Sequence, residues 1–228
     1  TKRKISMFSR AQKLIGEDGL QRLFASKVLV VGVGGVGGYA VEMLARAGVG
    51  TLGIMDGDLV DISNKNRQII ALDSTLGKSK VDAFKERVLD INANCKVITF
   101  NERFSADNSK VLDTEWDYIV DAIDYFEDKV NLICLAKQKG FNIISAMGAG
   151  NRVELCDFEI SDIYKTSYDP LAKKLRKALK DRDVKSHTVC FTKTPALSTT
   201  DGVGSVSYVP PLCGIKLAGF VIQKLLQV

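Results

Sequence analysis

The sequence predicts an α/β fold in which a mainly parallel sheet is flanked by helices. Three observations predict it. Short β-branched and apolar runs alternate with longer segments of helical pattern. The first of these runs ends in a glycine-rich turn, which leads into a helical segment and a second apolar run, the pattern of a βαβ unit. The length of 228 residues, with 46% hydrophobic and 26% charged residues, suits one globular domain over residues 1–228.

The elements of the first half follow from this alternation. Short apolar runs are expected to be buried parallel strands, and the longer segments between them are expected to be helices. The expected strands are residues 27–32, 51–56 and 96–100. The expected helical segments are residues 9–14, 20–24, 39–47 and 79–90.

The alternation continues to Gly150 and then changes. Residues 118–121 and 141–145 are expected strands, with a helix over 130–139 between them. Beyond Gly150, two strand-like runs flank a basic helix and are expected to join the sheet as antiparallel additions. A segment rich in Thr, Ser and Gly then predicts a mobile loop, followed by an apolar helix. These late elements are the runs 153–160 and 188–193, the loop 194–207 and the helix 212–226, which follows Pro210 and Pro211.

Positive charge is concentrated in one short stretch. The whole chain has a formal net charge of +5, whereas residues 165–193 alone hold nine Lys or Arg against three Asp. The rest of the chain is therefore close to neutral. We expect a basic, loop-rich insertion over residues 151–207 that contacts a polyanionic partner.

Composition argues against several classes of protein. No run of about 18 uncharged apolar residues is present, so a transmembrane span is not expected. No apolar signal core follows the basic residues 2–4, so no secretory peptide is expected. The five scattered cysteines form no CxxC pair, which favours free thiols in a reducing compartment and hence a cytoplasmic protein. The single histidine, His187, argues against a histidine-based metal site or a Ser-His-Asp triad.

The glycine-rich turn predicts a nucleotide site. Gly32, Gly34 and Gly37 match G-x-G-x-x-G, and Gly35 lies within the same turn. The motif follows an expected strand and opens an expected helix, which is the context that it needs. Glycines allow phosphate oxygens to approach the backbone, and the helix N-terminus supplies free N–H groups. Asp56, at the end of the second strand, is placed to accept hydrogen bonds from a ribose. Together these features predict a Rossmann-like nucleotide-binding sheet.

Further polar residues beyond Asp56 favour a nucleotide with a longer phosphate chain. Asn64, Arg67 and Lys80 lie just past the ribose-binding end, and cations of this kind suit a triphosphate with a pyrophosphate leaving group. Asp124 follows the fourth expected strand at the same edge of the sheet, where a carboxylate could hold Mg²⁺ on the phosphates. ATP and Mg²⁺ are therefore the expected cofactors.

These residues also carry a family resemblance. The glycine turn and the residues from Asp56 to Lys80 and 121–124 resemble the adenylating domain of the ubiquitin-activating-enzyme-like superfamily, and residues 9–12 resemble its N-terminal arginine motif. The resemblance implies adenylylation of a carboxylate by Mg-ATP in a homodimer. It implies ribose binding by Asp56 and assigns Arg10 to the phosphates of the neighbouring subunit's site. The resemblance also implies that the nucleotide is bound by Asp58, Asn64, Arg67 and Lys80, and that magnesium is bound by Asp124. The implied catalytic residues are Arg10, Arg67, Lys80 and Asp124.

Four later segments resemble one branch of that superfamily, the tRNA threonylcarbamoyladenosine dehydratases. This resemblance implies an ATP-driven dehydration, in which the threonylcarbamoyl carboxylate on an anticodon-loop adenosine is adenylylated and the side chain then closes into a ring. The ring-closing nucleophile is already in the substrate, so no enzyme thiol is required. Residues 154–158 depart from the pattern because they lack an expected Asp-Pro pair. The matching segments are residues 145–151, 162–166, 169–172 and 204–211.

The basic segment predicts an RNA-binding helix. Asp169 and Pro170 form a helix start, after which leucines recur on one face. The opposite face is basic and is expected to meet tRNA phosphates. Its members are Lys173, Arg176, Lys177 and Lys180.

Other functions stay open from the sequence. A second carboxylate-adenylating candidate is an adenylyltransferase for a ubiquitin-like sulfur carrier, although such proteins usually have two CxxC pairs for zinc. A thioester-forming cysteine would be Cys190 or Cys213, of which Cys190 is expected to be buried and inert. A nicotinamide-dependent oxidoreductase would leave Arg67, Lys80 and Asp124 without a role, and a non-catalytic nucleotide-sensing RNA-binding module would not consume ATP. The sequence also leaves open whether a sulfur-transfer or redox partner protein is used. The last helix could belong to the core, to a dimer interface or to a membrane-surface contact.

Overall fold

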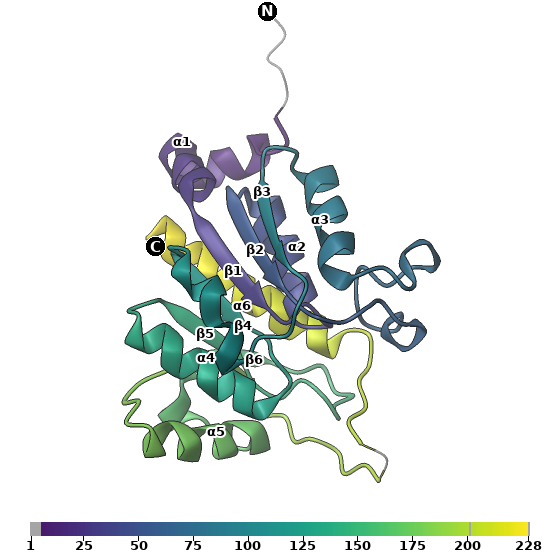
Figure 1. The fold of residues 1–228 in the computed structure, drawn as a ribbon, viewed down its shortest axis with the longest axis vertical. Coiled ribbons are helices and arrows are strands. Elements are labelled where there is room, and N and C mark those ends of the chain that lie inside the picture. The colour runs from purple at the N-terminus through teal and green to yellow at the C-terminus, as the bar shows by residue number, and fades with distance from the viewer. Residues whose placement is uncertain (1–5, 201, 228) are drawn as a thin grey trace, which may run out of the picture.

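The chain folds around a single seven-stranded sheet with the strand order β3-β2-β1-β4-β5-β7-β6 (Figure 1). The structure, a computed structural model, describes residues 6–200 and 202–227. All strands are parallel except β6, which pairs antiparallel with β7. The predicted α/β class and mainly parallel sheet are confirmed. The strands are β1 Lys27–Val31, β2 Thr51–Met55, β3 Lys96–Phe100, β4 Tyr118–Asp121, β5 Ile143–Ala146, β6 Phe158–Asp162 and β7 Thr188–Thr192.

Helices cover both faces of the sheet, because successive side chains of a strand point to opposite sides. In β1, Val28 and Val30 pack into one core with α2, α3 and α6, whereas Leu29 and Val31 pack into the other with α4 and α5. All four of these side chains are at most 1% exposed. The α-helices are α1 Ser9–Ala25, α2 Gly37–Ala47, α3 Lys80–Ile91, α4 Phe126–Gln138, α5 Pro170–Asp181 and α6 Val209–Leu226.

The first helix differs from the expected pair of short segments. α1 is continuous from Ser9 to Ala25 except at Gly16, whose φ of 71° and ψ of −179° break the helical geometry. A glycine accepts this conformation without the steric cost that a Cβ would add. The two expected segments therefore lie on either side of a kink, and both are longer than the periodicity indicated.

The last third of the sheet corrects two expectations. β7 is parallel to β5 and only β6 is antiparallel, so one of the two predicted antiparallel additions is wrong. β6 begins at Phe158, not at residue 153, and the preceding Val153 and Leu155 are exposed. Between β5 and β7 the chain runs through β6 and α5, and a crossover of this length permits β7 to lie parallel beside β5.

α6 begins three residues earlier than expected, because Pro210 and Pro211 lie inside its first turn, where a missing N–H costs nothing. It is the helix among the described residues that is long and apolar enough to cross a membrane, but half of that window is buried in the protein. A Cβ on Gly214 would lie 2.1 Å from the Val36 carbonyl oxygen, so α6 lies directly on the start of α2. The inner face of α6 is therefore part of the core.

Candidate active site

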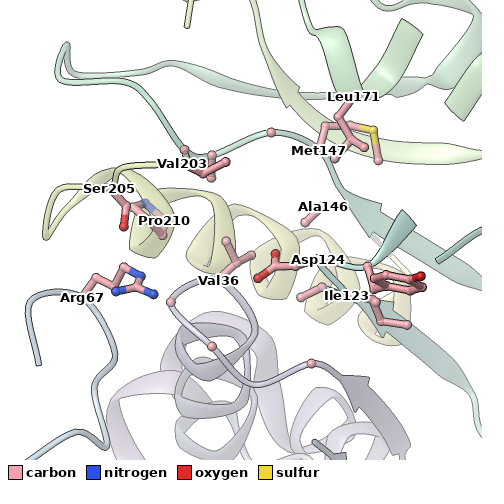
Figure 2. Close-up of a pocket in the computed structure, with 18 of the residues that line it drawn as sticks. Val36, Arg67, Ile123, Asp124, Ala146, Met147, Leu171, Val203, Ser205 and Pro210 are labelled. Atoms are coloured by element: carbon pink, nitrogen blue, oxygen red, sulfur yellow. The ribbon is translucent and has the colours of Figure 1, made fainter. Parts of the chain in front are cut away.

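A cavity of about 820 Å³ opens at the carboxyl ends of the central strands (Figure 2). The strand order reverses between β1 and β4, and crevices form at such switch points because the following loops diverge to opposite faces. The loops after β1 and β2 line one half of the cavity, which we call the nucleotide half. The loop after β5, the start of α5 and the segment before α6 line the other, which we call the acceptor half.

The glycines of the turn divide into structural and cavity-lining positions. Gly32 has a φ of +83°, and a Cβ there would lie 2.6 Å from the Ala122 carbonyl oxygen. A Cβ on Gly37 would lie 1.9 Å from the Gly32 carbonyl oxygen, so a side chain at this position would not fit. Gly34 and Gly35 instead line the cavity beside the start of α2, where free N–H groups favour an anion.

Asp56 holds the glycine turn as well as facing the cavity. Its Oδ2 accepts a hydrogen bond from the Val33 N–H at 2.8 Å, and its Oδ1 accepts one from the Asp58 N–H at 2.9 Å. The carboxylate therefore fixes the loop after β1 against the loop after β2. It lines the nucleotide half, as the sequence predicted.

Lys80 is brought to the same place from the start of α3. Only 5% of it is exposed, and its Nζ lies 2.9 Å from Asp58 Oδ2 and 3.7 Å from Asp56 Oδ1. Arg103, which sequence analysis did not identify, lies 2.7 Å from Asp58 Oδ1. Burial tends to raise the pKa of Asp58, but hydrogen bonds from Lys80 and Arg103 outweigh it, and the pKa is lower than usual. Asp58 therefore stays ionised and links both cations.

Asn64 and Arg67 enter the cavity from the loop that follows β2. Asn64 is buried, and its Oδ1 accepts a hydrogen bond from the Asp61 N–H at 3.1 Å. Arg67 is half-buried beside the glycine turn, and its Nη1 donates to the Ser63 carbonyl oxygen at 3.0 Å and to Asn66 Oδ1 at 2.8 Å. Figure 2 shows the Arg67 guanidinium near Val36 and Pro210. Both of its partners are neutral, so its charge is available to an anion in the cavity.

Asp124 follows β4 and points into the cavity between the two halves (Figure 2). Desolvation by the walls raises its pKa, although the positive charges of Lys129, Lys80 and Arg67 oppose that shift. Within residues 6–200 and 202–227, no side chain forms a hydrogen bond or ion pair with its carboxylate. The side chain is exposed to the cavity, so its carboxylate is open to a cation held on a ligand.

The acceptor half contains a buried arginine, Arg152, to which sequence analysis gave no role. Arg152 is 3% exposed, and its guanidinium donates to the carbonyl oxygens of Gly148, Gly150 and Thr194 at 2.8–3.0 Å. Asp169 caps α5, and its carboxylate also accepts a hydrogen bond from the Gly148 N–H at 3.1 Å. These contacts join three separate segments into one wall. No motif marked Arg152, because its function depends on carbonyl groups that only the fold brings together.

Gln68 belongs to the segment that carries the family resemblance, but sequence analysis gave it no role. It is 6% exposed and lines the nucleotide half, and its Oε1 has no hydrogen-bond partner in the described part of the chain. An unpartnered buried oxygen costs free energy unless a ligand or water satisfies it. In the sequence, its position next to Arg67 is the feature that could have identified Gln68 as a site residue.

Arg10 does not reach this cavity within its own chain. Arg10 is exposed and belongs to α1, which leads into the amino end of β1 (Figure 1). The residues that line the cavity lie instead at the carboxyl ends of the strands. A role for Arg10 in the site of another subunit therefore stays a prediction.

The basic helix α5 has an exposed lysine face, but Arg176 is not part of it. Lys173, Lys177 and Lys180 are exposed, and none forms an ion pair within the described residues. Arg176 instead donates to the Thr166 carbonyl oxygen at 3.0 Å. Placing Arg176 on the lysine face was wrong, because its long side chain turns back to cap the turn before α5. We call the three remaining residues the lysine face.

The two late cysteines are buried, as expected for Cys190. Cys190 and Cys213 are both fully buried, with their Sγ atoms 3.8 Å apart, and burial with this contact raises the pKa of Cys213. Neither lines the cavity, and all five cysteines are free thiols. The geometry therefore offers no thiol nucleophile to a ligand in the cavity.

Comparison with known proteins identifies relatives of this chain. The model of the ThiF family matches residues 8–228. A tRNA threonylcarbamoyladenosine dehydratase of Bacillus subtilis is 36% identical over 243 aligned positions, which cover 98% of this chain and 96% of that protein. The crystal structure of an E. coli tRNA N6-threonylcarbamoyladenosine dehydratase in complex with ATP superposes with a TM-score of 0.92 at 30% identity, covering 97% of this chain and 94% of that one. The complex of the E. coli enzyme with AMP has a TM-score of 0.91.

Proposed function

Because the chain belongs to the ThiF family, we propose that it is an ATP-dependent tRNA threonylcarbamoyladenosine dehydratase. The observation that carries the proposal is one cavity with two different halves. Glycine backbone and cations line the first half, and a separate wall built by Arg152 and Asp169 lines the second. Such a cavity can hold a nucleotide and a carboxylate-bearing acceptor together.

ATP occupies the nucleotide half. The phosphates lie over Gly34 and Gly35 at the start of α2, and the ribose lies at Asp56. Arg67 and Lys80 are within the same cavity and stabilise the negative charge that develops as pyrophosphate leaves. Their contacts in the folded chain hold them in place before the substrate arrives, so little reorganisation is needed.

The reaction has two steps. A carboxylate oxygen of the threonylcarbamoyl group attacks the α-phosphorus of ATP, and pyrophosphate leaves. A nucleophile within the same side chain then attacks the activated carbonyl carbon, the ring closes and AMP leaves. The substrate supplies its own nucleophile, so proximity is built in and the buried cysteines are not needed.

Mg²⁺ fits this site through Asp124. The ion usually binds to one or two carboxylates and to substrate phosphates, and Asp124 is an exposed, cavity-lining carboxylate that forms no hydrogen bond or ion pair among the described residues. When bound, the ion neutralises phosphate charge. The chain's own part is to hold the Asp124 carboxylate at the end of β4.

The tRNA approaches along α5. This helix begins at the cavity, where Pro170 and Leu171 are lining residues, and the lysine face starts within its first turn. Phosphates of the anticodon arm pair with that face while the modified adenosine enters the acceptor half. A homodimer with Arg10 acting across the interface, a cytoplasmic location, a sulfur-transfer or redox partner and a membrane-surface role for α6 remain predictions.

Dependence on modified tRNA tests the proposal. The purified protein is incubated with ATP and with tRNA that either carries or lacks the threonylcarbamoyl group. We expect AMP and pyrophosphate only with the modified tRNA, together with loss of one water mass from the modified nucleoside. AMP formation that instead requires a small carrier protein would assign the chain to the sulfur-carrier adenylyltransferases.

A further inference from the structure

One segment of the chain contacts both halves of the cavity. Residues 196–205, which we call the bridging segment and which the structure describes except for residue 201, lie between β7 and α6. Ala196, Val203 and Ser205 of this segment line the cavity. Figure 2 shows Ser205 near Pro210 above Arg67, with Val203 further along the same wall.

Asn151 fixes the bridging segment on the acceptor side. Its backbone N–H donates to the Gly204 carbonyl oxygen at 2.7 Å, and its Oδ1 accepts from the Gly204 N–H at 2.6 Å. Its carbonyl oxygen accepts from the Leu197 N–H at 2.6 Å, and its Nδ2 donates to Thr199 Oγ1 at 3.1 Å. Four hydrogen bonds from one residue hold the segment at three positions.

The backbone of Asn151 is adapted to this role. Its φ is 56°, in the left-handed region that most residues avoid and that asparagine tolerates. The neighbouring Gly150 leaves room for the segment, because a Cβ there would lie 2.4 Å from Val203 Cγ1. The loop after β5 and the bridging segment therefore fit closely together.

Asn66 fixes the other end of the segment on the nucleotide side. Its Nδ2 donates to the Ser205 carbonyl oxygen at 2.9 Å, and its Oδ1 accepts from Arg67 Nη1 at 2.8 Å. Arg67 is the cavity cation whose partners are neutral. The contacts thus run from Arg67 through Asn66 to Ser205, and from the adjacent Gly204 to Asn151.

We propose that Asn66 and Asn151 are positioning residues that hold the bridging segment as a wall shared by both halves, so that ATP binding strengthens tRNA binding. Phosphates that engage Arg67 hold its guanidinium against Asn66 Oδ1, and Asn66 Nδ2 in turn holds the Ser205 carbonyl oxygen, so the bound nucleotide favours this arrangement of the segment. The tRNA then meets an acceptor wall that is already in this arrangement. The inference rests on the proposed function, because it requires that both ligands bind here.

The test is a binding cycle with two ligands. Affinity for threonylcarbamoyl-modified tRNA is measured with and without an ATP analogue that has a methylene group between its α- and β-phosphates, so that no adenylate forms. We expect the analogue to tighten tRNA binding by about fivefold or more in the unaltered protein, and tRNA to tighten analogue binding by the same factor. In Asn66→Ala and in Asn151→Gly the factor should fall below about twofold.

Two features of the experiment distinguish loss of the positioning contacts from a general loss of folded structure. Asn151→Gly keeps the left-handed backbone and its two backbone hydrogen bonds, and removes only the side-chain contacts. Asn142→Ala is the matched control. Asn142, like Asn66, is exposed and donates one hydrogen bond to a carbonyl oxygen, that of Asp117 at 3.2 Å, and it lies before β5 and away from the cavity. Affinity for the analogue alone should be unchanged in Asn151→Gly and Asn142→Ala, and KM for tRNA should rise more than kcat falls in the two test variants.

The outcomes are distinguishable. If the unaltered protein binds both ligands without coupling, or if both test variants keep the full factor, the inference is wrong while the proposed function stands. A loss of coupling in Asn142→Ala of the same size would also overturn it. If the unaltered protein releases no AMP in the presence of modified tRNA, the proposed function itself fails, whatever the coupling.

Discussion

Arg67 and Lys80 both face the nucleotide half, but neighbouring charges affect them differently. Lys80 is buried against Asp58 and Asp56, so its positive charge is largely balanced by carboxylates. Arg67 has only neutral acceptors, the Ser63 carbonyl oxygen and Asn66 Oδ1. A phosphate is therefore attracted more strongly to Arg67 than to Lys80, whereas Lys80 also holds the loop after β2 through its ion pairs.

Replacing Arg67 by Gln should reduce turnover far more than it reduces stability. Loss of one preorganised charge on the leaving group is expected to lower kcat for AMP release by about 10²–10³. The control is Lys65→Gln, because Lys65 belongs to the same loop and pairs only with exposed Asp73. A turnover loss of equal size in both variants, measured as pyrophosphate release, would contradict a specific role for Arg67.

His187 does not line the cavity, but it contributes to the pH dependence of the free energy of unfolding. It is fully buried with Nε2 2.8 Å from Ser145 Oγ, and Nδ1 has no partner within the described residues. Burial lowers its pKa to about 3, and the charges of Lys137 and Lys129 act in the same direction, while Asp162 opposes them. The folded protein therefore favours the neutral form of the His187 ring.

The unfolded chain binds this proton near pH 6.5 and the folded chain does not, so the stability from His187 is present above pH 6.5 and is lost as pH falls toward 3. Between pH 6.5 and 4.5 we expect the free energy of unfolding to fall by about 2–3 kcal/mol from this group alone. Denaturant titrations at several pH values should show a shallower decline for His187→Gln than for the unaltered protein. Equal slopes would show that His187 does not cause the decline.

At the scale of elements, α5 combines two roles on one helix. Its leucine face is buried against α4 and the sheet, and the Asp169 side chain caps its first turn. Lys173, Lys177 and Lys180 face outward, while Arg176 turns inward to the turn before the helix. Periodicity separated the two faces, but it could not show that a long arginine folds back toward a carbonyl oxygen.

The lysine face should govern the salt dependence of tRNA binding. Replacing Lys173, Lys177 and Lys180 by Gln keeps helix propensity and should reduce the log–log salt slope by about two to three units if each contacts a phosphate. Arg176→Gln is the contrasting variant. It should lower stability by about 1–3 kcal/mol and leave the salt slope unchanged. An unchanged slope in the triple variant would place the RNA site elsewhere.

At the scale of the whole molecule, the cavity lacks the N-terminal arginine that the family resemblance assigns to it. Arg10 lies on α1 beyond the amino end of β1, and no cavity-lining residue belongs to α1. A second subunit is therefore required if Arg10 is to contact phosphates.

Mixed dimers test this arrangement. Arg10→Ala and Asp124→Ala should each be nearly inactive alone, but a heterodimer of the two contains one site with both side chains intact. We expect mixing under exchanging conditions to restore AMP release well above the sum of the separate variants. Heterodimers that are verified by differential tagging and remain inactive would show that Arg10 does not act across an interface.

The sequence by itself determined the parallel sheet and the placement of Asp56, Lys80 and Asp124 at one edge of it. These follow from local rules, since buried strands are continuous apolar runs and glycine turns before helices bind phosphate. The kink at Gly16 and the proline-containing start of α6 were missed because both depend on local conformations that periodicity does not show. The acceptor half was decided by the tertiary structure. Arg152, Asn151 and Asn66 act on backbone carbonyl groups from distant segments, and such groups are present at every residue, so no pattern of side chains marks which of them will meet.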